Sequence, residues 1–306
     1  MSLPTLLITH GCGQAWVIGP DLAQEWDRAV RFGLKRVGAP YAAEIDVRFA
    51  FYGDLWRPDG PFGERASSKQ EPTALQAAVA SAMFPAGPGP YDANQPTTAQ
   101  LAAHVAKGLG VDRIVVEWFL KDLDEYLTDK AIRDKTNERL FQEAAGIRTD
   151  IVLLGHSMGS IVAYLCLMEG RPAFANVRGF VTFGSPLGLP DIYDHVGKIA
   201  PGTPYPQQLK RWVNVFNRDD FATVIPRLAG LFKAPGGRAV EDVESVGRRP
   251  AAGNPGVGHD PCIYLSSMKL ARELCKMIES YWLGPAAVPP TAAVPPAAVP
   301  ATARSS

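Results

Sequence analysis

At the start of the chain, segments with the hydrophobic pattern of a strand flank a segment with the hydrophobic pattern of a helix. The apolar run TLLITH at 5–10 ends in a glycine turn and predicts a strand that leads into a loop. Apolar residues then recur at helical spacing, at Leu22, Trp26, Val30, Leu34 and Val37. The segment EIDVRFAFY at 44–52 alternates and is rich in β-forming residues, which predicts a second strand. The chain is therefore expected to begin with a strand, a helix and a strand.

The same order returns after residue 150. DIVLLG at 150–155 is a continuous apolar run, typical of a central parallel strand that is covered on both faces. The segment that follows is apolar on nearly all sides, as a buried helix would be. Further strand patterns lie at 177–186 and 211–217, a weaker one lies at 240–246, and an amphipathic helix pattern ends the series at 261–282. This order predicts an α/β fold with a mostly parallel central sheet and helices on both faces.

The strand pattern is interrupted between these two regions. Residues 53–95 are rich in proline, glycine and serine, and a short helix is predicted at 75–82. A loop of this length inside a compact domain is usually mobile or functional. The insertion is therefore a candidate lid or cap, and plain packing against its own domain is the alternative.

Helical periodicity returns at 98–145, and a break near Thr128 and Asp129 predicts two or more helices there. Asp122 and Tyr126 are spaced to share one helical face. We attribute this pair to packing and hydrogen bonding rather than to catalysis.

Repeats of proline and alanine fill the C-terminal segment 284–306. Such a repeat builds neither a helix nor a sheet, and it predicts an extended, disordered tail. We therefore expect one folded domain over residues 1–283.

The charge balance narrows the class of partner. The chain has 306 residues, and its 31 Lys and Arg residues equal its 31 Asp and Glu residues, so the net charge is zero. No basic field would attract nucleic acid or an anionic membrane, so neither is expected as a partner. Hydrophobic residues make up 46% of the chain, which is enough for a substantial core.

Targeting and redox features favour a cytoplasmic location. The N-terminal MSLPTLLITHGCG has no basic region, and its apolar run is too short for a signal peptide. No stretch approaches the length of a membrane-spanning helix. The four cysteines are scattered without a metal-binding CxxC pair, at Cys12, Cys166, Cys262 and Cys275. We expect them to be buried, reduced thiols.

The candidate chemistry centres on GHSMG at 155–159. A G-x-S-x-G match is a weak signal in a chain with 29 glycines, so its context decides. A buried strand is predicted directly before the motif and a buried helix directly after it. Such a turn would project Ser157 from a strained backbone, and Gly155 and Gly159 would give strand and helix room to approach. The Met158 N–H would then lie at a helix N-terminus, where a developing oxyanion is stabilised.

With this context the sequence resembles the α/β-hydrolase superfamily, whose nucleophile elbow matches GHSMG as written. The resemblance extends over about 6–282 but rests on a few motifs. It implies that Ser157 is a nucleophile. In the family a second oxyanion donor follows the first long strand, often after a His-Gly pair. Because THGCG stands in that place, the resemblance implies the Cys12 backbone N–H as the other donor.

A serine nucleophile needs a base, and the superfamily order is nucleophile, acid, histidine. Only His195 and His259 follow Ser157 in the sequence. His259 lies in a glycine-rich loop that enters the last predicted helix, where the family places its histidine. We therefore favour His259, and we expect His195 to be a surface histidine.

The acid is expected at the end of the strand in WVNVFNRDDFAT. Two adjacent aspartates stand there, and the register of the family pattern favours Asp220, with Asp219 as the alternative. Adjacent residues at a strand end point in opposite directions, so only one of them can face the histidine.

Together these residues imply a serine hydrolase that cleaves a carboxylic ester or thioester, takes a small-molecule acyl ester and needs no metal or organic cofactor. A peptidase or acyltransferase with the same triad remains an alternative. A non-catalytic binding module that keeps the fold is the alternative from another class. Three segments are candidates for the substrate walls: 53–95, 184–196 and 221–232.

Overall fold

The computed structural model describes residues 2–57, 71–83, 97–202, 204–234, 236–245 and 258–283. The predicted tail at 284–306 lies outside these ranges, as do 58–70 and 84–95 of the predicted insertion. The expected boundaries of the domain and its tail therefore stay predictions.

Within the described ranges, strands form one sheet in the order β2-β1-β3-β4-β5-β6. They are β1 (Thr5–Thr9), β2 (Val47–Ala50), β3 (Ile151–His156), β4 (Val177–Phe183), β5 (Arg211–Phe216) and β6 (Glu241–Glu244). Every neighbouring pair is parallel. The predicted α/β class with a parallel central sheet is confirmed, including the weak strand that became β6.

The edge strand β2 is shorter than the nine-residue pattern around it suggested. Its ladder with β1 ends where Thr9 pairs with Ala50. Beyond that point a side chain replaces the backbone as hydrogen-bond acceptor, because the Tyr52 backbone N–H donates to His10 Nε2 at 3.1 Å. The hydrophobic alternation therefore continues past the hydrogen-bonded strand.

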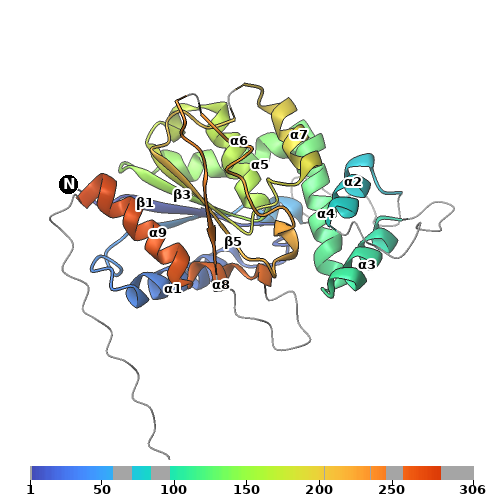
Figure 1. The fold of residues 1–306 in the computed structure, drawn as a ribbon, viewed down its shortest axis with the longest axis horizontal. Coiled ribbons are helices and arrows are strands. Elements are labelled where there is room, and N and C mark those ends of the chain that lie inside the picture. The colour runs from blue at the N-terminus through green and yellow to red at the C-terminus, as the bar shows by residue number, and fades with distance from the viewer. Residues whose placement is uncertain are drawn as a thin grey trace, which may run out of the picture.

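Helices cover both faces of the sheet (Figure 1). On one face lie α1 (Gly19–Arg36), α8 (Pro261–Leu265) and α9 (Met268–Ile278), and on the other lie α5 (Lys130–Ala145), α6 (Met158–Glu169) and α7 (Pro190–Ile199). A hydrophobic core lies on each face of the sheet, and successive residues of a strand point into opposite cores. Leu6 and Ile8 pack on the side of α1 and α9, and Leu7 packs on the side of α6. This two-sided burial explains the continuous apolar runs of the central strands.

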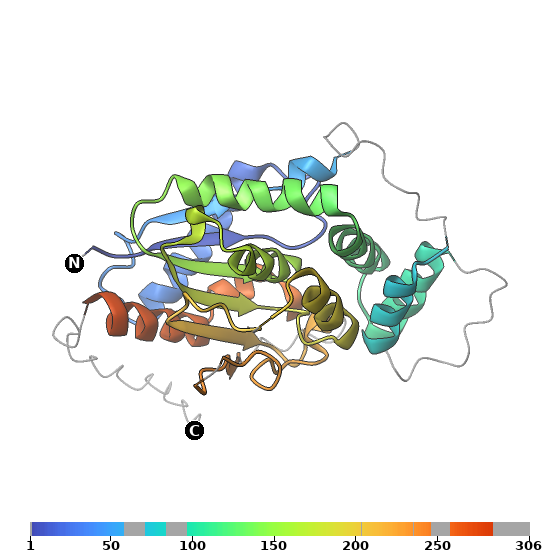
Figure 2. The same cartoon turned by 90° about the horizontal axis from the view of Figure 1, so that it is seen from above.

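Three further helices, α2 (Ala74–Met83), α3 (Thr98–Leu109) and α4 (Arg113–Thr128), lie side by side at one end of the sheet (Figures 1 and 2). The break predicted near Thr128 and Asp129 is confirmed, because the Asp129 side chain caps α5 by accepting from the Ala131 and Ile132 amides. A second break separates α3 from α4 at Gly110, whose φ is +66°.

Short helical turns also occur along the chain, at η1 (Gly53–Trp56), η2 (Pro172–Phe174), η3 (Phe221–Thr223) and η5 (Glu279–Leu283). No helix within the described ranges is both long enough and apolar enough to cross a membrane.

Two helical features differ from the sequence analysis. Residues 190–199, considered only as part of a substrate wall, form α7, which begins at Pro190 and buries Ile192 and Val196. A proline start and an apolar i, i+4 pair were the available signals. The single helix expected at 261–282 is divided, because Ser267 caps a new helix by accepting from the Leu270 amide at 3.2 Å.

Two helical glycines give a matched test of this packing. A Cβ at Gly33 would lie 2.6 Å from the Leu265 carbonyl oxygen, whereas a Cβ at Gly197 has no atom within 4 Å. We expect Gly33→Ala to destabilise the protein by about 1–3 kcal/mol, because α1 must separate from α8. Gly197→Ala should stabilise it by about 1 kcal/mol through helix propensity. Urea denaturation measures both, and equal shifts in one direction would contradict this packing.

Candidate active site

The candidate residues gather where the sheet changes direction. From β1 the chain crosses to β2 on one side, and from β2 it later crosses back to β3 on the other side of β1. In such sheets a crevice forms at the carboxyl ends of the two strands that flank this switch point. Residues 10–14 follow β1 and Ser157 follows β3, so both segments emerge at that crevice.

Ser157 sits in a strained turn between β3 and α6. Its φ is +52°, and no other non-glycine residue in the described part of the chain has a positive φ. A Cβ at Gly155 would lie 2.7 Å from the Ser160 Cα, and a Cβ at Gly159 would overlap the His10 carbonyl oxygen. Both glycines are therefore required by close backbone approach, as the elbow motif predicts.

The structure brings Ser157, His259 and Asp220 together in one line. His259 Nε2 lies 2.9 Å from Ser157 Oγ, and His259 Nδ1 lies 2.8 Å from Asp220 Oδ1. Because an ionised carboxylate only accepts, His259 Nδ1–H donates to Asp220, and Nε2 is left to accept from the serine hydroxyl. This is the arrangement that activates a serine nucleophile, and the catalytic roles themselves stay predictions.

Asp220 is buried and both of its carboxylate oxygens accept hydrogen bonds. Oδ1 also accepts from the Ala222 amide at 2.8 Å, and Oδ2 accepts from the Tyr264 hydroxyl at 2.7 Å. Burial and the adjacent carboxylate raise the Tyr264 pKa well above its usual value, so its hydroxyl remains a donor. The neighbouring Asp219 is exposed, and its backbone N–H donates to Asn217 Oδ1.

His156 holds the loop that carries His259. Its Nε2–H donates to the His259 carbonyl oxygen at 3.0 Å, and the two rings lie 4.7 Å apart. Burial and the nearby His259 lower the His156 pKa well below its usual value, so the ring is neutral. The Phe221 ring contacts His259 at a centroid distance of 4.6 Å. Sequence analysis missed both supports, because each depends on contacts across the fold.

The loop that carries the expected second oxyanion donor is braced from two directions. His10 donates from Nδ1 to the Gly11 carbonyl at 2.8 Å, and its ring stacks on Tyr52. From the other side, the Gly13 amide donates to Asp122 Oδ2 at 2.8 Å. The interpretation of Asp122 as a hydrogen-bonding residue is correct, but its partner is this loop. Cys12 lies between these two fixed points.

Met158 is the first residue of α6, so its N–H is one of the unpaired donors at a helix N-terminus. A Cβ at Gly11 would lie 2.6 Å from the Ser157 Cβ, which shows how closely the loop after β1 approaches the elbow. The two amides expected to bind an oxyanion thus belong to segments in direct contact.

A cavity of about 170 Å³ opens beside Ser157. Its apolar wall includes Val115, Trp118, Phe119, Phe221 and Pro261. Phe221 comes from the predicted wall segment 221–232, but no residue of 184–196 and no described residue of 53–95 lines this cavity. Helix α4 supplies most of the wall instead. Its apolar spacing was visible in the sequence, but the cavity it faces was not.

The remaining candidate residues lie elsewhere. His195 is on α7, is half-buried rather than on the surface, and donates from Nδ1 to the Asp191 carbonyl within its own helix at 2.8 Å; it does not line the cavity beside Ser157. Of the four cysteines, Cys166 is buried and the other three are only half-buried, and within the described residues none of the four forms a disulfide. In the part of the chain that the structure covers, no group of three or more His, Cys, Asp or Glu side chains is placed to hold a metal ion.

Comparison with known families adds a match over the centre of the chain. A family described as "PGAP1-like alpha/beta domain" matches residues 118–199, a range that contains β3, Ser157 and α6. The matched range ends before Asp220 and His259. The elbow and the parallel sheet around it thus agree with the family match. The match supports an assignment of the chain to the α/β-hydrolase superfamily.

The match to this family suggests a hydrolase. No curated protein sequence matches the chain. Among solved structures, one similar chain is a lipase-esterase related protein from Clostridium acetobutylicum ATCC 824. The two share 11% identity over 90% of this chain and 94% of that chain, with a TM-score of 0.31.

Burial of His10 predicts a dependence of stability on pH. Burial lowers the pKa of His10 from 6.5 to about 4, so the unfolded chain binds this proton more readily than the folded one. The stabilisation is complete above pH 6.5 and is lost as the pH falls towards 4. The loss amounts to roughly 3 kcal/mol, and His156 adds to it in the same direction.

The measurement is urea denaturation from pH 7.5 to 4.5 on the wild type and His10→Asn. The variant should be less stable at pH 7.5 and show a clearly weaker pH dependence, because the shifted imidazole is gone. Parallel curves for the two proteins would contradict a buried neutral His10.

The Tyr264 hydroxyl gives a second test of the site. Tyr264→Phe removes the hydroxyl that donates to Asp220 Oδ2, and a hydrogen bond to a charged group contributes about 1.5–3 kcal/mol. We expect the free energy of unfolding at pH 7 to fall by about 2 kcal/mol. Tyr281→Phe is the control, because that hydroxyl is exposed and its contact with the Lys210 carbonyl is long, at 3.5 Å. Equal effects of the two changes would show that Asp220 does not depend on Tyr264.

Proposed function

We propose that the chain is a serine hydrolase that cleaves a carboxylic ester or thioester through an acyl-enzyme on Ser157. The observation that carries this proposal is the continuous hydrogen-bonded line from Ser157 Oγ through His259 to Asp220 Oδ1, with distances of 2.9 and 2.8 Å. The strained φ of Ser157 and the helix that starts at the next residue support the same reading.

In the first half of the reaction Ser157 Oγ attacks the acyl carbon. His259 Nε2 accepts the serine proton, and Asp220 stabilises the resulting imidazolium through Nδ1–H. The carbonyl oxygen becomes an oxyanion that accepts hydrogen bonds from the Met158 and Cys12 amides. As the tetrahedral intermediate collapses, His259 returns the proton to the departing alcohol or thiol.

The second half releases the acyl group. A water molecule gives a proton to His259 Nε2 and attacks the acyl carbon, the same two amides stabilise the oxyanion, and the proton returns to Ser157 Oγ. His259 Nε2 accepts a proton and then donates it in each half of the reaction, so Nδ1 must keep its own proton throughout. Asp220, which is held by Tyr264 and the Ala222 amide, supports this requirement.

The apolar wall beside Ser157 supports an acyl ester as the small-molecule substrate. The uniform apolar character of Val115, Phe119 and Phe221 favours a hydrocarbon acyl group. Because no Asp, Glu, Lys or Arg side chain lines this cavity, an anionic substrate group is disfavoured there.

We infer a reducing compartment such as the cytoplasm as the place of action. The four cysteines, none of which forms a disulfide within the described residues, support this inference, because disulfides are the rule for small secreted domains and rare in the cytoplasm.

Labelling with a fluorophosphonate, followed by ester kinetics, tests the proposed function. Wild type should be labelled covalently on Ser157, and Ser157→Ala should not be labelled. On a short-chain aryl ester the same change should lower kcat by on the order of 10³ or more, because the nucleophile is lost. Ser266→Ala is the control, since Ser266 follows α8 and its hydroxyl donates over a long distance, 3.5 Å, to the Ile263 carbonyl. Equal labelling of wild type and Ser157→Ala, or none in either, would reject the proposal.

His259→Gln and Asp220→Asn extend the test to the other two residues. Both should lower kcat by on the order of 10³ or more, whereas Asp219→Asn should leave it within about twofold. A large effect at Asp219 and none at Asp220 would reverse the assignment of the acid.

A further inference from the structure

The cavity beside Ser157 is small for a ligand site. Its volume of about 170 Å³ lies below the range of roughly 300–1,000 Å³ that is usual for drug-sized ligands. At about 30 Å³ for each water-sized group, it holds about five or six such groups. A methylene group occupies a similar volume, so the cavity suits an acyl chain of about four to six carbons.

The inner part of the apolar wall is closely packed and rigid. Phe119 and Phe221 are 2% and 6% exposed, and their rings meet edge to face at a centroid distance of 5.8 Å. Phe221 also contacts the His259 ring, so any movement of this pair would disturb the base. The close packing of buried aromatic rings fixes this side of the cavity.

The outer part of the wall is different. Trp118 and Val115, one turn apart on α4, line the same cavity but are each 39% exposed, so this part of the wall also meets solvent. The indole also packs directly on the loop after β1, because a Cβ at Gly13 would lie 2.6 Å from Trp118 Cε3. Trp118, the larger of these two side chains, therefore stands where the cavity meets the surface.

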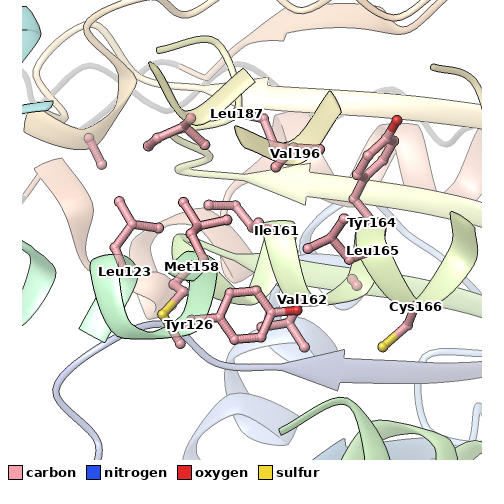
Figure 3. Close-up of a cluster of buried hydrophobic side chains, with 14 of the residues drawn as sticks. Leu123, Tyr126, Met158, Ile161, Val162, Tyr164, Leu165, Cys166, Leu187 and Val196 are labelled. Carbon is pink, nitrogen blue, oxygen red and sulfur yellow. The ribbon is translucent and has the colours of Figure 1, made fainter. Parts of the chain in front are cut away.

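Helix α4 keeps this part of the wall in place. Asp122, one turn further along, accepts the Gly13 amide at 2.8 Å, and Tyr126 donates to Asn137 Oδ1 on α5 at 2.7 Å. Figure 3 shows Leu123 and Tyr126 beside Met158 at the start of α6, within one buried cluster. The helix is anchored to the element that positions Ser157, so a longer chain cannot displace it cheaply.

We propose that Trp118 is the specificity-determining residue of this site and limits the substrate to esters of short-chain acyl groups. The inference rests on the proposed function, because it assumes that the acyl group bound to Ser157 lies in this cavity. Replacing the indole by a methyl group joins the cavity to the surface and admits a longer chain without changing the reacting groups.

The test is a series of p-nitrophenyl esters from acetate to decanoate. Wild type should be most active with acyl chains of about four to six carbons and fall steeply beyond them. In Trp118→Ala the ratio of kcat/KM for the octanoate to that for the butyrate should rise by on the order of tenfold or more, because a single methylene that does not fit already costs a factor of that size. Trp118→Phe should give an intermediate ratio.

Ile114→Ala is the matched control, since Ile114 is on the same helix, 44% exposed, and does not line the cavity. Its octanoate-to-butyrate ratio should equal that of wild type. A loss of support for the loop at Gly13 would lower kcat equally for all chain lengths, and only a change in the ratio supports the proposal. An active Trp118→Ala with the wild-type ratio would overturn it.

Rates of labelling by fluorophosphonates with short and long alkyl chains give a second readout that does not require turnover. Trp118→Ala, or Trp118→Phe if the alanine variant fails to fold, should react faster with the long-chain probe relative to the short-chain probe. If wild type reacts with no probe and no ester, the proposed function fails, and the inference about Trp118 fails with it. If labelling is normal but the chain-length ratios are unchanged in the Trp118 variants, the inference about Trp118 is overturned and the proposed function is not.

Discussion

The register between β1 and β3 is the constraint on which the site depends. Thr9 pairs with Gly155, so the residues that follow each strand emerge side by side: His10 and Gly11 on one, His156 and Ser157 on the other. The two segments then approach so closely that side chains at Gly11 or Gly159 would overlap Ser157 or the His10 carbonyl. A shift by one residue would reverse the faces of both strands and separate the loop from the elbow. The backbone pairing thus sets where a nucleophile and an oxyanion loop can meet.

Around this junction the polar groups are buried and nearly all satisfied. Asp220 accepts from His259, from Tyr264 and from the Ala222 amide, which distributes its charge over three donors. His10 and His156 are neutral because burial lowers their pKa values, and each donates a ring N–H to a backbone carbonyl. A polar network of this kind is expensive to rearrange in a low-dielectric interior. Its rigidity is what allows one histidine to face both a serine and a carboxylate.

Helix α4 links the site to the group of helices at the end of the sheet. Through Asp122 it holds the loop after β1, and through Trp118 and Phe119 it forms the wall of the cavity beside Ser157. One element therefore contacts both the segment expected to bind the oxyanion and the space available to the acyl group. Substitutions along α4 are expected to affect reactivity and selectivity together, and chain-length ratios separate the two effects.

The sequence by itself determined the order of strands and helices, because buried strands and amphipathic helices have distinct hydrophobic periods. It also identified the elbow at Ser157 and named His259 and an aspartate of the 219–220 pair, from motif context and the order implied by a family resemblance. Only the tertiary structure decided which aspartate faces His259, why β2 stops at Ala50 and that α4, rather than 53–95, lines the cavity among the described residues. It also revealed the supports from His156 and Tyr264. These features depend on contacts between residues at least 39 positions apart or on the direction of one side chain, and local periodicity carries no information about either.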